Sequence, residues 1–280
     1  MATILLTGQL WFRIPEIIQI RLEGEAPEGV YPKDVILTVL GKIRADGAVY
    51  KAIDFTGSYV ENLVVAGRMV ICNMAVEMGA KTAYMQPNQA VLDYVGARAA
   101  GPWEVETTDP GYRYEESYVF DVSSLEPQLA CPDSVENVHP LTEVTAEGPV
   151  KLDQGYIGSC TGGREEDIAA AASILRGRHI PEYTRLVVVP ASREVMLSCM
   201  EKGYIQDLME AGATITTPGC GACLGAHEGI LAPGEVCISS TNRNFPGRMG
   251  STEARIYLAS PAAVAASILN GRITDPRIYL

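Results

Sequence analysis

The sequence predicts an α/β protein whose strands alternate with helices and form parallel sheets covered by helices on both faces. Two observations in the second half of the chain predict this. The run Leu-Val-Val-Val at 186–189 has no polar face, and the segment 164–176 places Ile168, Ala171 and Leu175 on one helical side. Strands that are apolar on both faces are typical of parallel sheets, because the crossover helices cover both sides.

Each further element has a local signal. Strands are predicted where short apolar or β-branched runs are bounded by turn residues: 13–23, 48–55, 79–85, 118–122, 152–157, 186–189, 214–215, 236–239 and 256–258. Helices are predicted where apolar residues recur at helical spacing: 32–43, 60–78, 88–96, 164–176, 193–202, 205–210 and 261–269. Pro32 suits a first helical turn, and Ser260 and Gly271 bracket the last helix as N-cap and C-terminal glycine.

The length of 280 residues accommodates two domains. Pro and Gly interrupt the stretch 99–149, and we predict an extended connector at 131–145. The expected organisation is therefore two three-layer α/β/α domains, at 13–130 and 146–280. The segment 1–12 has the pattern of a helix end and its exit.

Charge and composition exclude several classes of protein. The net charge of −12 argues against nucleic acid as a partner, although local arginines can still attract a small anion. No apolar run approaches the roughly 20 residues of a membrane-spanning helix, and the start has no signal-peptide pattern. Seven cysteines at uneven spacing favour free thiols or metal ligands in a cytoplasmic protein over a disulfide framework.

Three cysteines lie in glycine-rich loops that we expect to be neither helix nor strand. Cys220 and Cys223 belong to Thr-Pro-Gly-Cys-Gly-Ala-Cys-Leu-Gly at 217–225, and Cys160 to Gly-Ser-Cys-Thr-Gly-Gly at 158–163. Glycine within two residues of each cysteine lets backbone N–H groups approach the sulfurs of an iron–sulfur cluster. We therefore predict a cluster on these three thiolates, which leaves one iron open as a Lewis acid.

Other meanings of these cysteines stay open at this point. A zinc site would use His227 beside Cys220 and Cys223, and a lone C-x-x-C also occurs in redox pairs. Cys160 alone would be a buried free thiol. The four remaining cysteines lie in apolar elements or in the connector and are expected to be inert: Cys72, Cys131, Cys199 and Cys237.

A polar loop at 240–248 follows another predicted strand. Asn242, Arg243 and Arg248 offer amide and guanidinium donors that suit carboxylates, although in isolation a solvated turn would explain them. Ligands of parallel sheets bind beyond the carboxyl ends of the strands. Cys160, Cys220 and Asn242 each follow a predicted strand, so one sheet edge could bring them together.

Two of the polar residues in the predicted helix 60–78 share one face. Asn73 and Glu77 are four residues apart and project from one face, and spacing alone favours a surface stripe. His139 and His179 are expected to be structural rather than catalytic.

These motifs resemble the aconitase superfamily, and most closely the large subunits of 3-isopropylmalate dehydratase and homoaconitase. The resemblance rests on Gly-Ser-Cys-Thr at 158–161, Gly-Cys-Gly-Ala-Cys-Leu-Gly at 219–225 and Asn-Arg-Asn-Phe-Pro-Gly-Arg at 242–248. In the first half, Pro-Lys-Asp-Val-Ile-Leu at 32–37 and Ile-Cys-Asn-Met-Ala-Val-Glu at 71–77 agree with it.

The resemblance implies the second and third aconitase-type domains and a hydro-lyase that interconverts 2- and 3-isopropylmalate in leucine biosynthesis. It implies a [4Fe–4S] cluster on Cys160, Cys220 and Cys223, and catalytic roles for Asn73 and Glu77. Asn242, Arg243 and Arg248 would bind a small 2-hydroxy di- or tricarboxylate. A homoaconitase-type large subunit and a non-catalytic, cluster-binding pair of domains are the alternatives.

Two departures from the family pattern, and the family's separate small subunit, add expectations. Gly162 stands where the family usually has Asn, which we expect to loosen a contact near the cluster. The family's N-terminal domain, with its Asp-Ser-His-Thr motif, has no counterpart here, so 1–12 is expected to be its remnant. In the family, a separate small subunit supplies the proton-abstracting serine and forms a heterodimer or heterotetramer with the large subunit. No part of this chain resembles that small subunit. We therefore expect the chain to be inactive alone.

Overall fold

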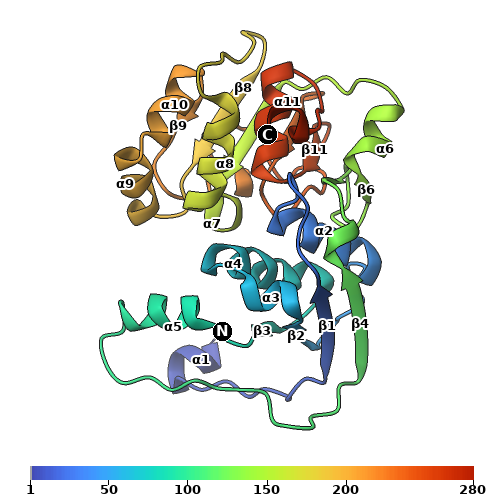
Figure 1. Cartoon of the computed structure of the whole chain (residues 1–280), viewed down its shortest axis with the longest axis vertical. Coiled ribbons are helices and arrows are strands. Elements are labelled where there is room, and N and C mark those ends of the chain that lie inside the picture. Colours follow the sequence, from blue (N-terminus) through green and yellow to red (C-terminus); the bar gives the residue numbers. More distant parts are fainter. Residues whose placement is uncertain (1) are drawn as a thin grey trace.

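A computed structural model describes residues 2–280, which form two sheets stacked with helices between and beside them (Figure 1). The four-stranded sheet has the order β3-β2-β1-β4, and all of its pairs are parallel. Its strands are β1 (Ile17–Glu23), β2 (Ala52–Thr56), β3 (Thr82–Met85) and β4 (Glu116–Asp121). The alternation of apolar and polar residues in β1 buries Ile18, Ile20 and Leu22 on one face.

The seven-stranded sheet has the order β6-β5-β11-β10-β7-β8-β9. Its parallel part consists of β7 (Gln154–Gly158), β8 (Arg185–Val189), β9 (Thr214–Ile215), β10 (Val236–Ser239) and β11 (Arg255–Leu258). The edge strands β5 (Gln128–Ala130) and β6 (Val138–Pro140) are antiparallel additions. The predicted α/β class with parallel sheets is thus confirmed, and the antiparallel edge was not anticipated.

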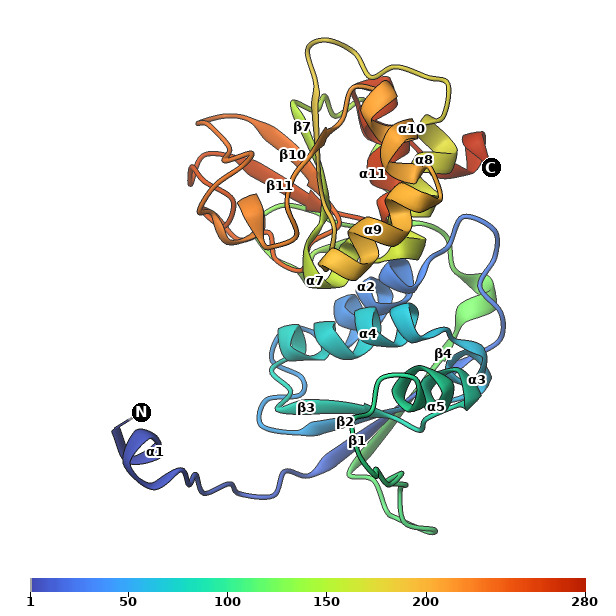
Figure 2. The same cartoon turned by 90° about the vertical axis from the view of Figure 1, so that its left-hand side faces the viewer.

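The helices α2 (Pro32–Ile43) and α4 (Val65–Met74) lie between the two sheets (Figure 2). One buried apolar cluster therefore includes residues of both sheets, such as Phe55 of β2 and Tyr156 of β7. The other face of the second sheet packs on a separate cluster with α8 (Glu165–Leu175), α9 (Arg193–Glu201), α10 (Tyr204–Glu210) and α11 (Pro261–Asn270). In α11, Ser260 caps the first turn and Gly271 ends the helix at φ 62°, as predicted.

The helix predicted at 60–78 is wrong as a continuous element. The chain forms α3 (Ser58–Asn62), an extended break at Leu63 and Val64, then α4 and the 3-10 turn η1 (Ala75–Met78). Buried Arg68 stabilises the break, because its guanidinium donates to the carbonyls of Val60, Leu63 and Gln86 at 2.6, 3.0 and 2.8 Å. The spacing of apolar residues, on which the helix prediction rested, gives no information about this contact.

The remaining elements are short. They are α1 (Ala2–Thr7), α5 (Gln89–Gly96), η2 (Val122–Ser124), α6 (Leu141–Ala146), α7 (Ser159–Gly162), η3 (Gly221–Leu224) and η4 (Pro276–Tyr279). The loops of Cys160 and Cys223 are thus single helical turns, not irregular loops as predicted. Residues 141–144, predicted to be extended, are helical, and the domain limits 13–130, 131–145 and 146–280 stay a prediction.

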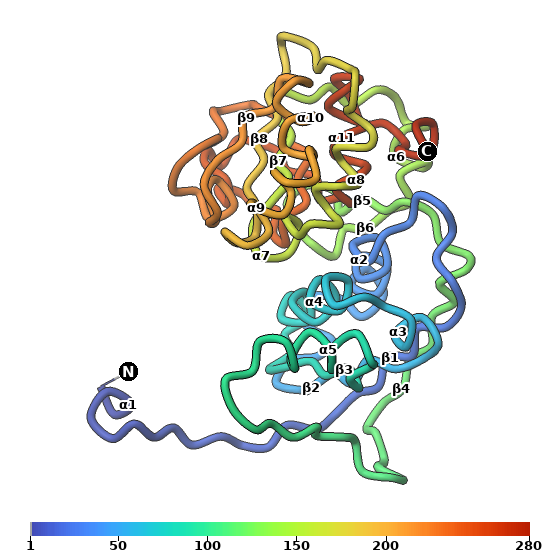
Figure 3. The backbone as a smooth tube through the Cα atoms, turned by 60° about the vertical axis from the view of Figure 1, so that its left-hand side comes forward, coloured from blue at the N-terminus to red at the C-terminus, as the bar shows by residue number. Residues whose placement is uncertain are grey.

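The N-terminal segment leads away from the first sheet (Figure 3). Its large apolar side chains are exposed, with Leu6 at 86%, Trp11 at 84% and Ile14 at 89%. Within residues 2–280, no helix combines the length and the apolar character that crossing a bilayer requires.

Candidate functional site

The loops that follow β7 and β10 meet at the carboxyl edge of the second sheet. The Ser240 hydroxyl accepts from the Gly158 N–H at 3.0 Å and donates to the Gly162 carbonyl at 3.0 Å. The hydroxyl of Tyr156, in β7, donates to the carbonyl of Cys220 at 2.7 Å. The strands are parallel neighbours, so these loops begin at one edge.

Close backbone approach explains the glycine at 162. A Cβ built there would lie 2.4 Å from Ser240 Oγ and 2.5 Å from the Ser240 carbonyl oxygen. Any larger residue, Asn included, would push the two loops of this structure apart. The expectation that Gly162 loosens a contact near the cluster stays a prediction. Ser159, one residue before Cys160, has a left-handed φ of 66° that fixes the turn.

Two of the three candidate cysteines are more exposed than the rest. Cys160 and Cys220 are exposed, whereas Cys223 is half-buried, as are Cys72 and Cys131, and all seven cysteines are free. Burial raises the pKa of Cys72, Cys131 and Cys199 to about 11 and raises that of Cys237 as well. These four thiols therefore stay protonated at neutral pH, in keeping with the inert role predicted for them.

A guanidinium stands beside one of the candidate cysteines. Arg248 Nη2 lies 4.0 Å from Cys223 Sγ, and Arg248 Nε is buried without a hydrogen-bond partner in the described chain. A buried N–H without a partner is costly, so an anionic group bound here would satisfy it. Three free thiols and an unsatisfied cation fit the donor set and the charge of an iron–sulfur cluster.

The zinc alternative is not supported. Among residues 2–280, no three or more His, Cys, Asp or Glu side chains are placed to hold one metal ion. His227 instead lies 3.3 Å from Glu228. A cubane cluster does not require its ligands to converge on one ion, since each thiolate binds a different iron.

Asn73 and Glu77 contact the second sheet's loops and are not a surface stripe. Asn73 Oδ1 accepts from Thr161 Oγ1 at 2.9 Å and from Asn242 Nδ2 at 2.6 Å. Arg243 Nε donates to the Glu77 carboxylate at 2.9 and 3.1 Å, and the Glu77 side chain is only 10% exposed. Two residues of the first half are thus joined to the two loops that carry Cys160 and Arg243.

One residue of this network was missed by the sequence reasoning. Lys33, in α2, is 3% exposed, and its Nζ donates to the Thr241 carbonyl at 2.6 Å. Burial lowers the pKa of Lys33 to about 8. A signal was present, because Lys33 continues the buried stripe Ile36, Leu37 and Leu40 at spacing i, i+3, i+4 and i+7.

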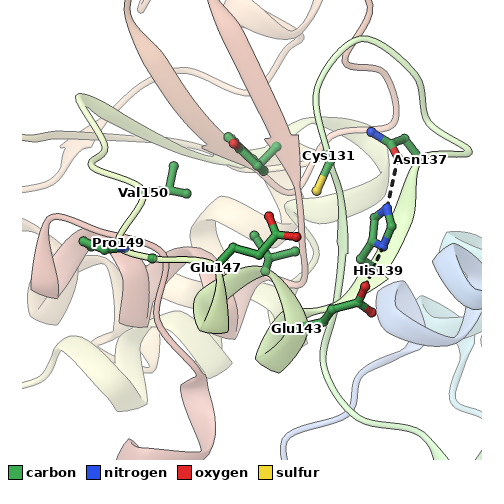
Figure 4. Close-up of a pocket in the computed structure, with 10 residues that line it drawn as sticks. Cys131, Asn137, His139, Glu143, Glu147, Pro149 and Val150 are labelled. Atoms are coloured by element: carbon green, nitrogen blue, oxygen red, sulfur yellow. Dashed lines mark hydrogen bonds and ion pairs between the residues drawn. The ribbon is translucent and has the colours of Figure 1, made fainter.

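A separate cavity lies away from these residues. It measures about 590 Å³ and is lined by residues such as Cys131, His139, Glu143 and Glu147, but by none of the predicted site residues (Figure 4). His139 contacts Asn137 at 3.1 Å and Glu143 at 3.5 Å there, which suits a structural histidine. A hollow of about 470 Å³ is lined by Asn73, Cys160 and Arg164, and it adjoins the predicted site.

The fold and the site define a parallel α/β protein in which thiols, amides and arginines gather at one sheet edge. The family model described as "Aconitase family (aconitate hydratase)" matches residues 1–271, and the chain belongs to this family.

Two curated relatives with nearly equal similarity have different names. The chain is 52% identical over 280 residues to 3-isopropylmalate dehydratase large subunit 1 of Methanopyrus kandleri, covering 100% of this chain and 66% of that protein. It is 51% identical over 278 residues to the probable methanogen homoaconitase large subunit of Methanothermobacter thermautotrophicus, covering 99% and 64%. The chain thus spans just under two thirds of the length of these two relatives.

A solved structure, the holo-form of Thermococcus kodakaraensis aconitase X, shares 12% identity with the chain at a TM-score of 0.43. The match covers 86% of this chain and 53% of that one. Likeness at this level is too low to support a conclusion.

Proposed function

We propose that the chain is the large-subunit component of an iron–sulfur hydro-lyase that interconverts 2- and 3-isopropylmalate, a step of leucine biosynthesis. Membership of the aconitase family and the name of the Methanopyrus kandleri relative support this activity. The observation that carries the proposal is the polar network of Asn73, Glu77, Asn242 and Arg243, which draws both halves of the chain together beside Cys160. We place the protein in the cytoplasm, where seven free cysteines suit the reducing conditions.

Cys160, Cys220 and Cys223 are the residues that would hold a [4Fe–4S] cluster. The support is their free thiols, the glycines around them and the unsatisfied Nε of Arg248. When bound, a cluster with three protein thiolates supplies an open iron that polarises a hydroxyl and so promotes its departure as water.

The chain's own polar residues bind and orient the hydroxy acid. Arg243 and Arg248 offer guanidinium forks to its carboxylates, and Asn73 offers an amide donor. Asn242 lines the site and holds the Asn73 side chain, because its own amide nitrogen donates to Asn73 Oδ1. Glu77 is the candidate proton donor: in its protonated form it would give its proton to the departing hydroxyl, which leaves as water, and the carboxylate that remains is the one that Arg243 holds.

A small subunit is the proposed partner. The name "large subunit" of the relatives supports a two-subunit enzyme, and the resemblance assigns the proton-abstracting serine to the other chain. The chain without this partner is therefore expected to give no turnover.

The second candidate is a homoaconitase-type activity. The specific observation in its favour is that a probable homoaconitase large subunit is as similar to the chain as the dehydratase is, at 51% against 52% identity. The two activities differ in the side chain of the hydroxy acid, so the substrate assay separates them.

The test is an assay of the anaerobically reconstituted chain, alone and together with a dehydratase small subunit and a polypeptide that carries the family's Asp-Ser-His-Thr domain. Each preparation receives 2-isopropylmalate or homocitrate, and the isomeric hydroxy acid is quantified. We expect conversion of 2-isopropylmalate by the complete assembly and none by the chain alone. Conversion of homocitrate only would favour the second candidate. Conversion of neither substrate by the cluster-loaded complete assembly would overturn both.

A further inference from the structure

A buried lysine links α2 to the loop that follows β10. Besides its bond to Thr241, Lys33 Nζ donates to Met74 Sδ at 3.2 Å and to Asn242 Oδ1 at 3.4 Å. An ammonium group has three donors and no acceptor. The side-chain amide of Asn242 must therefore turn its oxygen toward Lys33, and its nitrogen faces the other way.

The orientation of Asn242 determines that of Asn73. Asn242 Nδ2 donates to Asn73 Oδ1 at 2.6 Å and lies 3.2 Å from Thr161 Oγ1. Thr161 also donates to Asn73 Oδ1, at 2.9 Å, so this oxygen is saturated by two donors. Asn73 Nδ2 has no hydrogen-bond partner within residues 2–280, and Asn73 is exposed and lines the hollow beside Cys160.

We propose that Lys33 is a positioning residue: it fixes the side-chain amide of Asn242 and, through it, that of Asn73, so that Asn73 presents an N–H donor to an anionic hydroxy acid. The inference rests on the proposed function for the identity of that ligand. Removing the ammonium group leaves Asn242 free to rotate by half a turn, which would set its oxygen against that of Asn73. Asn73 would then rotate too and present a carbonyl oxygen, which repels a carboxylate.

The competing explanation is that Lys33 only ties down the loop backbone through the Thr241 carbonyl. The two explanations differ in a double-mutant cycle. If Lys33 acts through the Asn242 amide, Lys33→Met weakens ligand binding in the wild type and has little further effect in an Asn242→Ala background. If Lys33 only holds the backbone, the two effects multiply.

The experiment measures the dissociation constant of 2-isopropylmalate by calorimetry on the same complete assembly as the activity assay, for wild type, Lys33→Met, Asn242→Ala and the double variant. We expect about a tenfold loss in each single variant, the size of one charge-assisted hydrogen bond, and no further loss in the double variant. Lys42→Met, at an exposed position of the same helix, is the matched control and is expected to bind as wild type does. Multiplying effects would overturn the proposal.

A second measurement needs no ligand and keeps the two proposals separable. In nitrogen–proton NMR spectra of the chain, the Asn242 side-chain amide protons are expected to be protected from solvent exchange, because they are bonded to Asn73 and Thr161. Lys33→Met, or Lys33→Gln where Met does not fold, is expected to raise their exchange rate at least tenfold. Unchanged exchange would overturn the inference. If the Lys33 variant loses the amide protection but the wild-type protein binds no hydroxy acid, the inference about Lys33 stands and only the proposed function is overturned.

Discussion

Arg243 and Glu77 are separated by 166 positions in the sequence, yet one guanidinium nitrogen contacts both oxygens of the carboxylate, at 2.9 and 3.1 Å. The Glu77 side chain is 10% exposed and that of Arg243 is 39% exposed. The ion pair thus joins η1, after the first sheet's helix α4, to the loop after β10. A carboxylate that is largely removed from water depends on such a partner.

Replacing Arg243 by Ala is expected to destabilise the protein by about 1–3 kcal/mol, because it leaves the Glu77 carboxylate without its cation. Urea unfolding of the purified chain measures this. Arg98→Ala is the matched control, since its ion pair with Glu194 is exposed and is expected to be worth at most about 1 kcal/mol. Equal losses of unfolding free energy in the two variants would show that the buried ion pair stabilises the protein no more than the exposed one.

Replacing Glu77 by Gln keeps the shape of the side chain but removes its proton-exchange chemistry. We expect turnover of the complete assembly, with the small subunit and the Asp-Ser-His-Thr domain, to fall by about 100-fold or more, the usual contribution of a positioned acid or base. The affinity for 2-isopropylmalate should change little, because Arg243 and Arg248 remain. A variant with near-normal turnover would remove Glu77 from the proposed mechanism.

Single Ser substitutions of Cys160, Cys220 and Cys223 are each expected to lower the iron and sulfide content of the reconstituted chain. A cluster held by two thiolates is less well retained than one held by three. Cys131→Ser is the control, because that thiol lies at the separate cavity of Figure 4. The iron and sulfide content of this variant should equal that of the wild type. Full retention in any of the three variants would exclude that cysteine as a ligand.

The glycine at 162 is predicted to be irreplaceable. Gly162→Ala places a Cβ within 2.5 Å of the Ser240 backbone carbonyl, so the loops must separate. We expect a destabilisation of about 1–3 kcal/mol by urea unfolding. Gly101→Ala, where no atom lies within 4 Å of the added Cβ, is expected to change stability by less than about 1 kcal/mol. A neutral Gly162→Ala would mean that this close approach does not constrain the loops.

The contribution of Lys33 to the free energy of unfolding is expected to change with pH in the alkaline range. Burial lowers its pKa in the folded protein to about 8, whereas the unfolded chain keeps the ordinary value near 10.4. Between these values the unfolded state binds more protons, so the wild type gains stability as pH rises. The unfolding free energy of wild type minus that of Lys33→Met should therefore increase from pH 8 to 10. A constant or falling difference would contradict the lowered pKa.

Most of the fold can be predicted from the sequence, because most helices and strands are determined by residues within the element or next to it. The strand at 186–189 is apolar on both faces, and Ser260 and Gly271 mark the ends of α11 by their own backbone chemistry. The break at Leu63 was missed because Arg68 stabilises it with contacts from outside the local spacing pattern.

The site was predicted less evenly. Cysteines in glycine-rich loops after strands are visible in the sequence, and so is the polar loop with Asn242 and Arg243. The partners of Asn73 are 88 and 169 positions away and that of Glu77 is 166 positions away, so spacing alone made the two residues look like a surface stripe. Lys33 was overlooked although it lies on the buried stripe of its own helix.

The central claim is that Cys160, Cys220 and Cys223 together hold one iron–sulfur cluster. Diffraction from crystals of the anaerobically reconstituted chain, recorded at the iron absorption edge, tests it most directly. The account predicts one compact anomalous peak that is bonded to the sulfurs of all three cysteines and leaves one iron without a protein ligand. An iron site bonded to other residues, or a cluster that omits Cys160, would contradict it.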